Sequence, residues 1–118
     1  TAPQTVLDWA DKRRVALERW VAEKKFIETD SNPDKVAKEL GTTKSLLNCY
    51  FAKYEHITFR EWRTRLRIKE AERILREEDV VLPALHELVG VSDKSNFHKH
   101  FKQLTGMTPN EYRKQVRK

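Results

Sequence analysis

Glycine, proline and cysteine are scarce in this chain of 118 residues, which has three glycines, four prolines and one cysteine. So few glycines and prolines leave long stretches without a turn former, and no strand-turn-strand rhythm is present. The sequence therefore favours an all-α fold. No apolar run approaches the roughly 18 residues that a membrane span requires, which excludes membrane insertion of this segment.

The single cysteine, Cys49, cannot form an internal disulfide, and no signal peptide opens the chain. Both observations predict a reducing, cytoplasmic location. We expect Cys49 to be inert. Redox sensing is the alternative, because Lys53 lies one helical turn away.

Catalytic and metal-binding patterns are also missing from the sequence. It has no Ser/His/Asp set, no glycine-rich phosphate loop and no Cys/His cluster at ligand spacing. His98 and His100 are two residues apart, so on a helix they point about 200° away from each other and make a poor chelating pair. We therefore expect no enzymatic activity, no metal and no cofactor.

The net charge of +6 is unevenly distributed along the chain. Residues 1–40 are neutral overall, whereas residues 41–69 hold seven basic and two acidic side chains. Residues 70–93 hold two basic and seven acidic side chains, and residues 94–118 hold seven basic and one acidic. Positive charge thus occurs in two separated segments, which indicate either a solvated face or a nucleic-acid-binding surface.

Apolar residues at three- and four-residue spacing predict about seven helices. The first is expected from about Val6 to Phe26, and a short second helix is expected to end at Gly41. A third helix follows within a few residues, and a longer helix runs from Thr58 to about Arg76. A short helix, a turn with glycine and another helix form the helix-turn-helix pattern.

The same pattern recurs after the long helix. A short helix is expected to end at Gly90 and the next at Gly106, and a last helix should begin at Thr108 and carry Tyr112 and Val116 inward. The chain thus divides into an N-terminal extension or connector (1–12), a first helix-turn-helix subdomain (13–57), a linker helix (58–77) and a second helix-turn-helix subdomain (78–118).

An internal repeat supports this division. A shift of 50 positions aligns residues 41–63 with residues 91–113, and six of the 23 pairs are identical. The turn glycines match with a one-residue slip. Both copies contain Thr-x-x-Glu, a capping box that satisfies backbone donors at a helix start, and Pro109 suits a first helical position. The identical pairs are Lys44/Lys94, Ser45/Ser95, Phe51/Phe101, Thr58/Thr108, Glu61/Glu111 and Arg63/Arg113.

Each basic segment begins at the second helix of a helix-turn-helix unit and continues through the capped helix behind it. Solvation alone does not explain this coincidence. DNA phosphates need Lys or Arg around an inserted helix, and helix N-termini add partial positive charge there. We therefore expect double-stranded DNA as the partner, with small polar residues at the front of each second helix contacting base edges.

Two sets of side chains are candidates for these contacts. One set lies at the front of each second helix and is expected to contact bases, and the other flanks it and is expected to contact phosphates. The base-contacting candidates are Thr43, Lys44, Ser45 and Asn48 in the first unit and Lys94, Ser95, Asn96, His98 and Lys99 in the second. The phosphate-contacting candidates are Lys53, Arg63, Arg65, Lys102, Thr108 and Arg113.

The expected linker helix from Thr58 to Arg76 has 19 residues. At roughly 1.5 Å per residue it spans about 28 Å. Adjacent major-groove openings lie roughly 34 to 36 Å apart. With the width of the units added, one monomer can place two recognition helices in successive grooves on one face of the DNA.

The string from Gly90 to Lys114 resembles the signature of the AraC/XylS family of bacterial transcription regulators, and residues 67–75 are similar to the linker helix of that family. The resemblance extends from about Leu17 to Arg113. It implies an all-α fold of about seven helices, promoter DNA binding, and RNA polymerase as a partner of activators. The matching residues of the signature are Gly90, Asp93, Ser95, Phe97, Phe101, Lys102, Gly106, Thr108, Pro109, Tyr112 and Arg113.

On this interpretation the chain is the C-terminal domain of a larger, cytoplasmic and nucleoid-associated regulator, with dimerisation through parts outside this chain. The sequence departs from the family pattern at three positions. His86 stands where a small alanine is usual, as at Ala37 in the first unit, which predicts a wider gap between helices or a tilted recognition helix. Val91 replaces the usual Phe, and Cys49 stands where a basic residue is common.

Other interpretations stay open from the sequence. The helices could engage a protein instead of DNA, or RNA, although no aromatic stacking platform is indicated for RNA. The arginines Arg60, Arg63, Arg65 and Arg67 are either a solvated face of the linker or phosphate contacts. The segment from Thr1 to Lys12 is either a connector toward a sensor domain or part of a dimer-forming helix.

Overall fold

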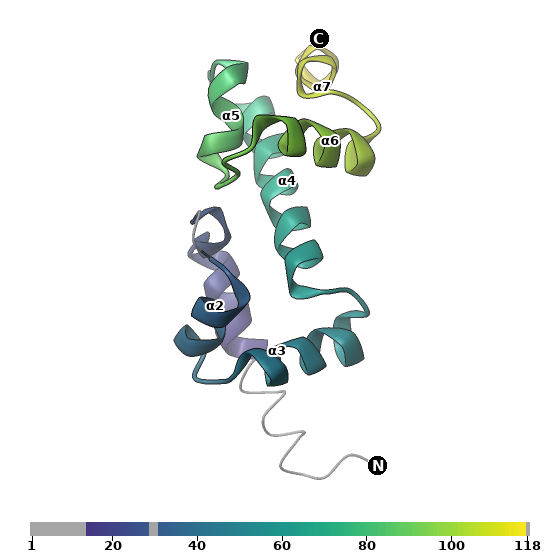
Figure 1. Cartoon of the computed structure of the whole chain (residues 1–118). Coiled ribbons are helices and arrows are strands. Elements are labelled where there is room, and N and C mark those ends of the chain that lie inside the picture. The colour runs from purple at the N-terminus through teal and green to yellow at the C-terminus, as the bar shows by residue number, and fades with distance from the viewer. Residues whose placement is uncertain (1–13, 29–30, 118) are drawn as a thin grey trace. The chain divides into compact units, whose positions relative to one another are not determined.

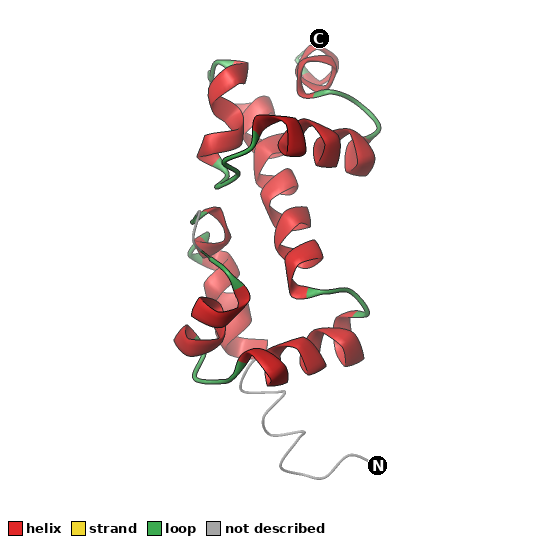
Figure 2. Ribbon diagram, viewed as in Figure 1, coloured by secondary structure: helices red, strands yellow, loops and turns green. Residues whose placement is uncertain are grey.

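The computed structural model describes residues 14–28 and 31–117, and all regular structure in these ranges is helical (Figures 1 and 2). The prediction of an all-α fold is therefore confirmed. A short 3-10 turn, η1 (Lys25–Ile27), and a π-helical turn, η2 (Phe51–Glu55), accompany the α-helices. The α-helices are residues 14–22, α2 (Pro33–Glu39), α3 (Lys44–Tyr50), α4 (Phe59–Glu77), α5 (Leu82–Leu88), α6 (Lys94–Thr105) and α7 (Pro109–Val116).

The described residues form two compact units. Unit 1 comprises residues 14–25 and 31–60, and unit 2 comprises residues 26–28 and 61–117. From residue 61 onward α4 is part of unit 2, because its apolar side chains are buried in the core of that unit. None of the helices in the described ranges is both long and apolar enough to cross a membrane.

An aromatic cluster forms the centre of unit 1. Phe51 and Phe59 are buried, with their rings 5.5 Å apart and nearly edge to face, and Trp20 lies 5.8 Å from Phe59. Tyr50 adds an edge contact to Phe51 at 5.4 Å. Such aromatic pairs contribute about 0.5–1.5 kcal/mol each beyond the burial of their area. The cluster packs the end of α3 against the first helix and the start of α4.

The first helix ends earlier than its apolar spacing predicts. Helical residues stop at Ala22, so the expected end at Phe26 is wrong. The physical reason is backbone conformation: Lys24 has a φ of 56°, which turns the chain into η1. This turn allows Phe26 to be buried. The expected start at Val6 and the segment 1–12 lie outside the described residues.

Unit 2 has a continuous apolar core around α4. Figure 1 shows α6 crossing α4, with α5 and α7 beside the C-terminal half of α4. Rings of Phe97 and Phe101 lie 5.9 Å apart, and Phe101 meets Tyr112 edge to face at 5.6 Å. The buried members of this core are Ile68, Ala71, Ile74, Leu75, Leu85, Val89, Phe97, Phe101 and Tyr112.

The last helix is attached to α4 by one buried aromatic side chain and by polar contacts. The expectation that Tyr112 points inward is confirmed, but Val116 is 38% exposed, so its expected burial is wrong. Arg117 supplies the attachment instead, because its Nε donates to the carbonyl oxygen of Leu75 at 2.8 Å and its Nη1 pairs with Asp79 at 3.0 Å. One turn of α7 is therefore held through a guanidinium rather than through an apolar side chain.

The turn after α2 is closed by two backbone hydrogen bonds. The N–H of Gly41 donates to the oxygen of Lys38 at 3.1 Å, and that of Thr42 donates to the oxygen of Ala37 at 2.8 Å. Gly41 has a φ of 73°, in the left-handed region that favours glycine.

The turn after α5 repeats this arrangement. The N–H of Gly90 donates to the oxygen of Glu87 at 3.1 Å, and that of Val91 donates to the oxygen of His86 at 2.9 Å. Gly90 has a φ of 84°. Both turns therefore use the same bonding pattern around a left-handed glycine, as expected of two copies of one motif.

The helices that follow the two turns also match. In unit 1, α3 has seven residues and η2 has five, and together they occupy Lys44 to Glu55. In unit 2, α6 has twelve residues, Lys94 to Thr105. The next residue is left-handed in both, with a φ of 59° at His56 and 79° at Gly106. The shift of 50 positions in the sequence is thus a repeat of backbone structure.

We predict that Gly90→Ala destabilises unit 2 much more than Gly106→Ala does. A Cβ on Gly90 would lie 2.1 Å from the backbone oxygen of Ile27, whereas a Cβ on Gly106 would meet nothing within 4 Å. Gly106→Ala should therefore lower the free energy of unfolding only by the strain of an alanine in the left-handed region, about 1 kcal/mol. Gly90→Ala has the same strain, and its steric clash lowers the free energy of unfolding by about a further 1–3 kcal/mol. Urea unfolding followed by circular dichroism measures both. Equal losses of unfolding free energy in the two variants would contradict the close approach of Gly90 to the backbone of Ile27.

Candidate nucleic-acid interface

The helix after the first turn presents its predicted contact residues to solvent. Thr43 caps α3, because its hydroxyl oxygen accepts from the N–H of Leu46 at 3.2 Å. Leu47 and Tyr50 are buried and fix the helix on the core of unit 1. A hydroxyl has one donor and two acceptor positions, so capping leaves Thr43 further hydrogen-bonding capacity. The exposed candidates are Thr43, Lys44, Ser45 and Asn48.

The matching helix of unit 2 is built in the same way with a different cap. Asp93 caps α6, because its Oδ1 accepts from the N–H of Asn96 at 3.0 Å. Phe97 and Phe101 are fully buried and fix the opposite side of the helix. The carboxylate stabilises the helix start and lowers the positive potential there. The exposed candidates are Lys94, Ser95, Asn96, His98 and Lys99.

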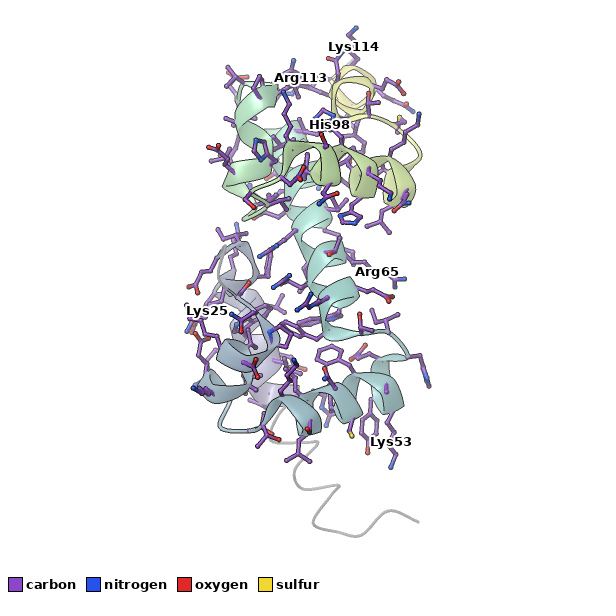
Figure 3. All side chains as sticks on the ribbon, viewed as in Figure 1. Lys25, Lys53, Arg65, His98, Arg113 and Lys114 are labelled. Carbon is purple, nitrogen blue, oxygen red and sulfur yellow. The ribbon has the colours of Figure 1, made fainter. Side chains whose placement is uncertain are left out.

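Three phosphate candidates are exposed. Lys53 and Arg65 extend into solvent from η2 and α4 (Figure 3), and Lys102 does so from α6. Lys53 also lies over its neighbouring ring, with Nζ 5.6 Å from the centroid of Tyr54. Their long side chains and positive charge suit contact with a nucleic-acid backbone.

Two other phosphate candidates have structural partners in unit 2. The hydroxyl oxygen of Thr108 caps α7 by accepting from the N–H of Glu111 at 3.2 Å, as the capping box predicts. Arg113, labelled in Figure 3, is half-buried, and its Nη1 donates to the oxygen of Val80 at 3.1 Å. These two side chains therefore already have a structural role, and any contact with phosphate would come in addition to it.

The sixth candidate, Arg63, is half-buried in the wall of a cavity within unit 2. The cavity has a volume of about 270 Å³ and lies between α4 and the turn before α6. Arg67, Asn96 and His100 line it as well. Arg63 thus faces a polar hollow beside the start of α6.

Arg67 is buried, and the solvated-face interpretation is wrong for this residue. Only 7% of it is exposed; its Nε donates to the oxygen of Phe26 at 2.6 Å and its Nη2 to the oxygen of Glu28 at 2.9 Å. Burial, and secondarily the charge of Arg63, lowers the pKa of Arg67 to about 10. The group therefore remains charged at neutral pH and serves to hold residues 26–28 on unit 2.

His86 occupies the place that Ala37 has in unit 1 and is accommodated by a hydrogen bond across the turn. It is buried, and its Nδ1 lies 2.8 Å from the oxygen of Val91. Since a carbonyl oxygen only accepts, Nδ1 carries the proton in this arrangement. The two backbone hydrogen bonds of the turn keep the same lengths as in unit 1 to within 0.1 Å.

The sequence prediction does not include part of the exposed surface of α3 and η2. Cys49 and Ala52 are exposed there, at the positions matched by Lys99 and Lys102 in the sequence repeat. Leu46 is 47% exposed as well. These three side chains are not strongly polar, so a pattern of polar and basic residues does not indicate them, although the 50-residue shift pairs them with polar residues of the second copy.

Arginines contribute less to the basic surface of unit 2 than the charge count implies. Arg113 and Arg117 hold α7 in place, so lysines carry most of the exposed positive charge of residues 94–117. Within the described ranges, no group of three His, Cys, Asp or Glu side chains comes together in a way that could hold a metal ion.

Comparisons with known proteins agree with this architecture. A family model described as a helix-turn-helix domain matches residues 36–115. The Msm operon regulatory protein of Streptococcus mutans is 28% identical over 81 residues, which are 69% of this chain and 29% of that protein. YtdP, an uncharacterized HTH-type transcriptional regulator of Bacillus subtilis, is 31% identical over 90 residues, which are 76% of this chain and 12% of that protein.

A solved structure shows the same fold. The C-terminal domain of AraT, a response regulator from Geobacillus stearothermophilus, superposes with a TM-score of 0.77 at 25% identity, covering 88% of this chain and 84% of that one. Fold, paired turns and family match together define a helix-turn-helix protein. The chain belongs to the AraC-type helix-turn-helix family of transcription-regulator DNA-binding domains, which confirms the resemblance found in its sequence. It spans less than a third of the length of the curated relatives it matches.

We predict opposite effects for two arginines of α4 that are two residues apart. Arg67→Ala removes this donor from the oxygens of Phe26 and Glu28, and the loss at the buried hydrogen bond to Phe26 costs about 1–3 kcal/mol. Arg65 is exposed, so Arg65→Ala changes stability by less than about 0.5 kcal/mol. Thermal unfolding checks stability. Binding to one DNA duplex at a temperature where both variants are folded should weaken for Arg65→Ala alone, and weakening by Arg67→Ala alone would refute these assignments.

Proposed function

We propose that this chain binds double-stranded DNA sequence-specifically, with α3 and α6 as recognition helices in successive major grooves, and so regulates transcription. The observation that carries the proposal is the repeated unit: a turn with the same two hydrogen bonds, followed by a capped twelve-residue helical segment with exposed polar and basic side chains. A helix fits the major groove, where each base pair offers a distinct pattern of donors and acceptors.

The proposed base contacts come from the exposed fronts of the two helices. In unit 1 these are Thr43, Lys44, Ser45 and Asn48, and in unit 2 they are Lys94, Ser95, Asn96, His98 and Lys99. Phosphate contacts are proposed for Lys53, Arg63, Arg65, Lys102, Thr108 and Arg113. Among these, Lys53, Arg65 and Lys102 are the exposed ones, and we expect them to contribute most.

The presence of two such units supports two grooves rather than one. Successive major grooves open roughly 34 to 36 Å apart, and proteins with two helix-turn-helix units can contact half-sites at this spacing. A binding site with two half-sites one helical turn apart follows from this proposal.

The larger setting of the chain is also proposed. We propose that the chain is the C-terminal, DNA-binding part of a larger regulator, in the cytoplasm at the nucleoid, and its match to only part of longer regulators supports the larger setting. The family resemblance suggests RNA polymerase as a further partner. Dimerisation would use parts of the protein outside this chain.

Selection from random duplexes, followed by footprinting, tests the proposal. We expect a selected site with two half-sites about 10 base pairs apart and a higher affinity for this site than for its scrambled sequence. Affinity for both should fall steeply with salt, because bound lysines and arginines release counterions. Equal affinity for selected and scrambled duplexes would remove the sequence-specific part of the proposal. Unchanged DNA affinity in a Lys44→Glu/Lys94→Glu variant would show that the proposed interface is not the DNA-binding surface.

Two single variants separate base contacts from phosphate contacts. Asn48→Ala should lower the ratio of selected to scrambled affinity by about tenfold, because a side-chain amide contributes about 1–3 kcal/mol of discrimination at an adenine. Lys53→Ala should weaken both complexes alike and reduce the slope of log affinity against log salt by about 0.9. Both residues are exposed, so stability serves as the control. An exchange of the two effects would show that the contact classes are reversed.

A further inference from the structure

The two segments that follow the turns have the same length but different exposed chemistry. Resting on the proposed DNA binding, we propose that they recognise different half-sites: α3 with η2 packs against thymine methyl groups of A·T pairs, and α6 donates hydrogen bonds to guanine. The chain would then require an asymmetric operator, with an A·T-rich half under unit 1 and a G·C-containing half under unit 2.

Charge distinguishes the two helices first. The segment Lys44 to Glu55 contains two lysines and one glutamate, whereas the segment Lys94 to Thr105 contains three lysines and no acidic residue. The difference lies on the exposed side, because Cys49 is matched by Lys99. Residues 44–50 and 94–100 are α-helical in both units and begin directly after the cap, so matched residues in these ranges occupy equivalent places in their units.

The exposed side of the first helix combines apolar groups with one amide. Leu46 is 47% exposed, and Cys49 and Ala52 are exposed as well. In the major groove the thymine C5-methyl is the apolar group that such side chains can cover. Asn48 lies between them in sequence and is exposed, and an amide pairs with the N6 and N7 positions of adenine. Methyl and amide contacts thus favour the same base pair.

The exposed side of α6 carries a charged donor at a matched position. Lys99 takes the place of Cys49 and Asn96 that of Leu46, and both are exposed. Lysine donates to the O6 and N7 acceptors of guanine, where two acceptors lie side by side. No exposed apolar side chain of α6 occupies the place of Leu46, so unit 2 has little with which to cover a thymine methyl there.

Base analogues in the selected duplex test the proposal. Uracil in place of thymine removes the C5-methyl, and 7-deazaguanine in place of guanine removes the N7 acceptor. We expect uracil to weaken binding about fourfold per contacted methyl in one half-site only. We expect 7-deazaguanine to weaken binding about tenfold in the other half-site only, since hydrogen bonds to charged donors are the stronger kind.

Matched variants assign each half-site to its unit. Leu46→Ala should reduce the sensitivity to uracil and keep the sensitivity to 7-deazaguanine, and Lys99→Ala should reduce the sensitivity to 7-deazaguanine and keep that to uracil. Both side chains are exposed, so neither change should affect folding, which thermal unfolding checks. In a repeated selection, Cys49→Lys should introduce guanine into the half-site under unit 1.

The possible outcomes separate this inference from the proposed function. Failure to select any site would end the proposed function itself. A selected site that binds with normal affinity when all its thymines are replaced by uracil would overturn the inference alone, and would leave Leu46, Cys49 and Ala52 as a surface for a protein partner. Sensitivity to both analogues in both half-sites would likewise overturn the proposed difference between the helices.

Discussion

The hydrogen bonds of Arg67 to the backbone oxygens of Phe26 and Glu28 are the constraint on which unit 2 depends. A guanidinium in the core would be costly without partners, and two carbonyl oxygens supply them at 2.6 and 2.9 Å. The same short segment brings the backbone of Ile27 against Gly90, where no Cβ fits. Residues far apart in sequence thereby fix the turn that precedes α6, and the direction in which its exposed side chains point follows from that turn.

The repeat conserves backbone hydrogen bonds and lets side chains differ. Turn bonds of nearly equal length recur in the two units although Ala37 is replaced by His86, because the larger ring bonds to Val91 across the turn. Caps recur although Thr43 is replaced by Asp93. A motif that is specified by its backbone leaves the outward positions free to acquire different chemistry, which is what the pair Cys49 and Lys99 displays.

Sequence patterns predicted those features that depend on local chemistry. Glycines marked both turns because only a left-handed residue fits there, and Thr108 marked the start of α7 because its hydroxyl satisfies a backbone donor. Features that depend on distant contacts were not predictable in this way. Nothing in the spacing of basic residues distinguishes buried Arg67 from exposed Arg65, and the fixation of α7 by Arg117 replaces the apolar contact expected of Val116. The predicted DNA contacts are polar or basic side chains, a criterion that does not include Leu46, Cys49 and Ala52 on the exposed side of the first helix.

The connection between glycine and helix cap is one residue longer in unit 2 than in unit 1. From glycine to cap the chain runs from Gly41 to Thr43 in unit 1 but from Gly90 to Asp93 in unit 2. The helix before the turn is therefore offset by 49 positions between the copies, and the helix after it by 50. A single insertion within the connection accounts for the change. Insertions are tolerated at such a point because each flanking helix is held by its own core contacts, so ancestry is better traced through the two helices separately than through one ungapped comparison.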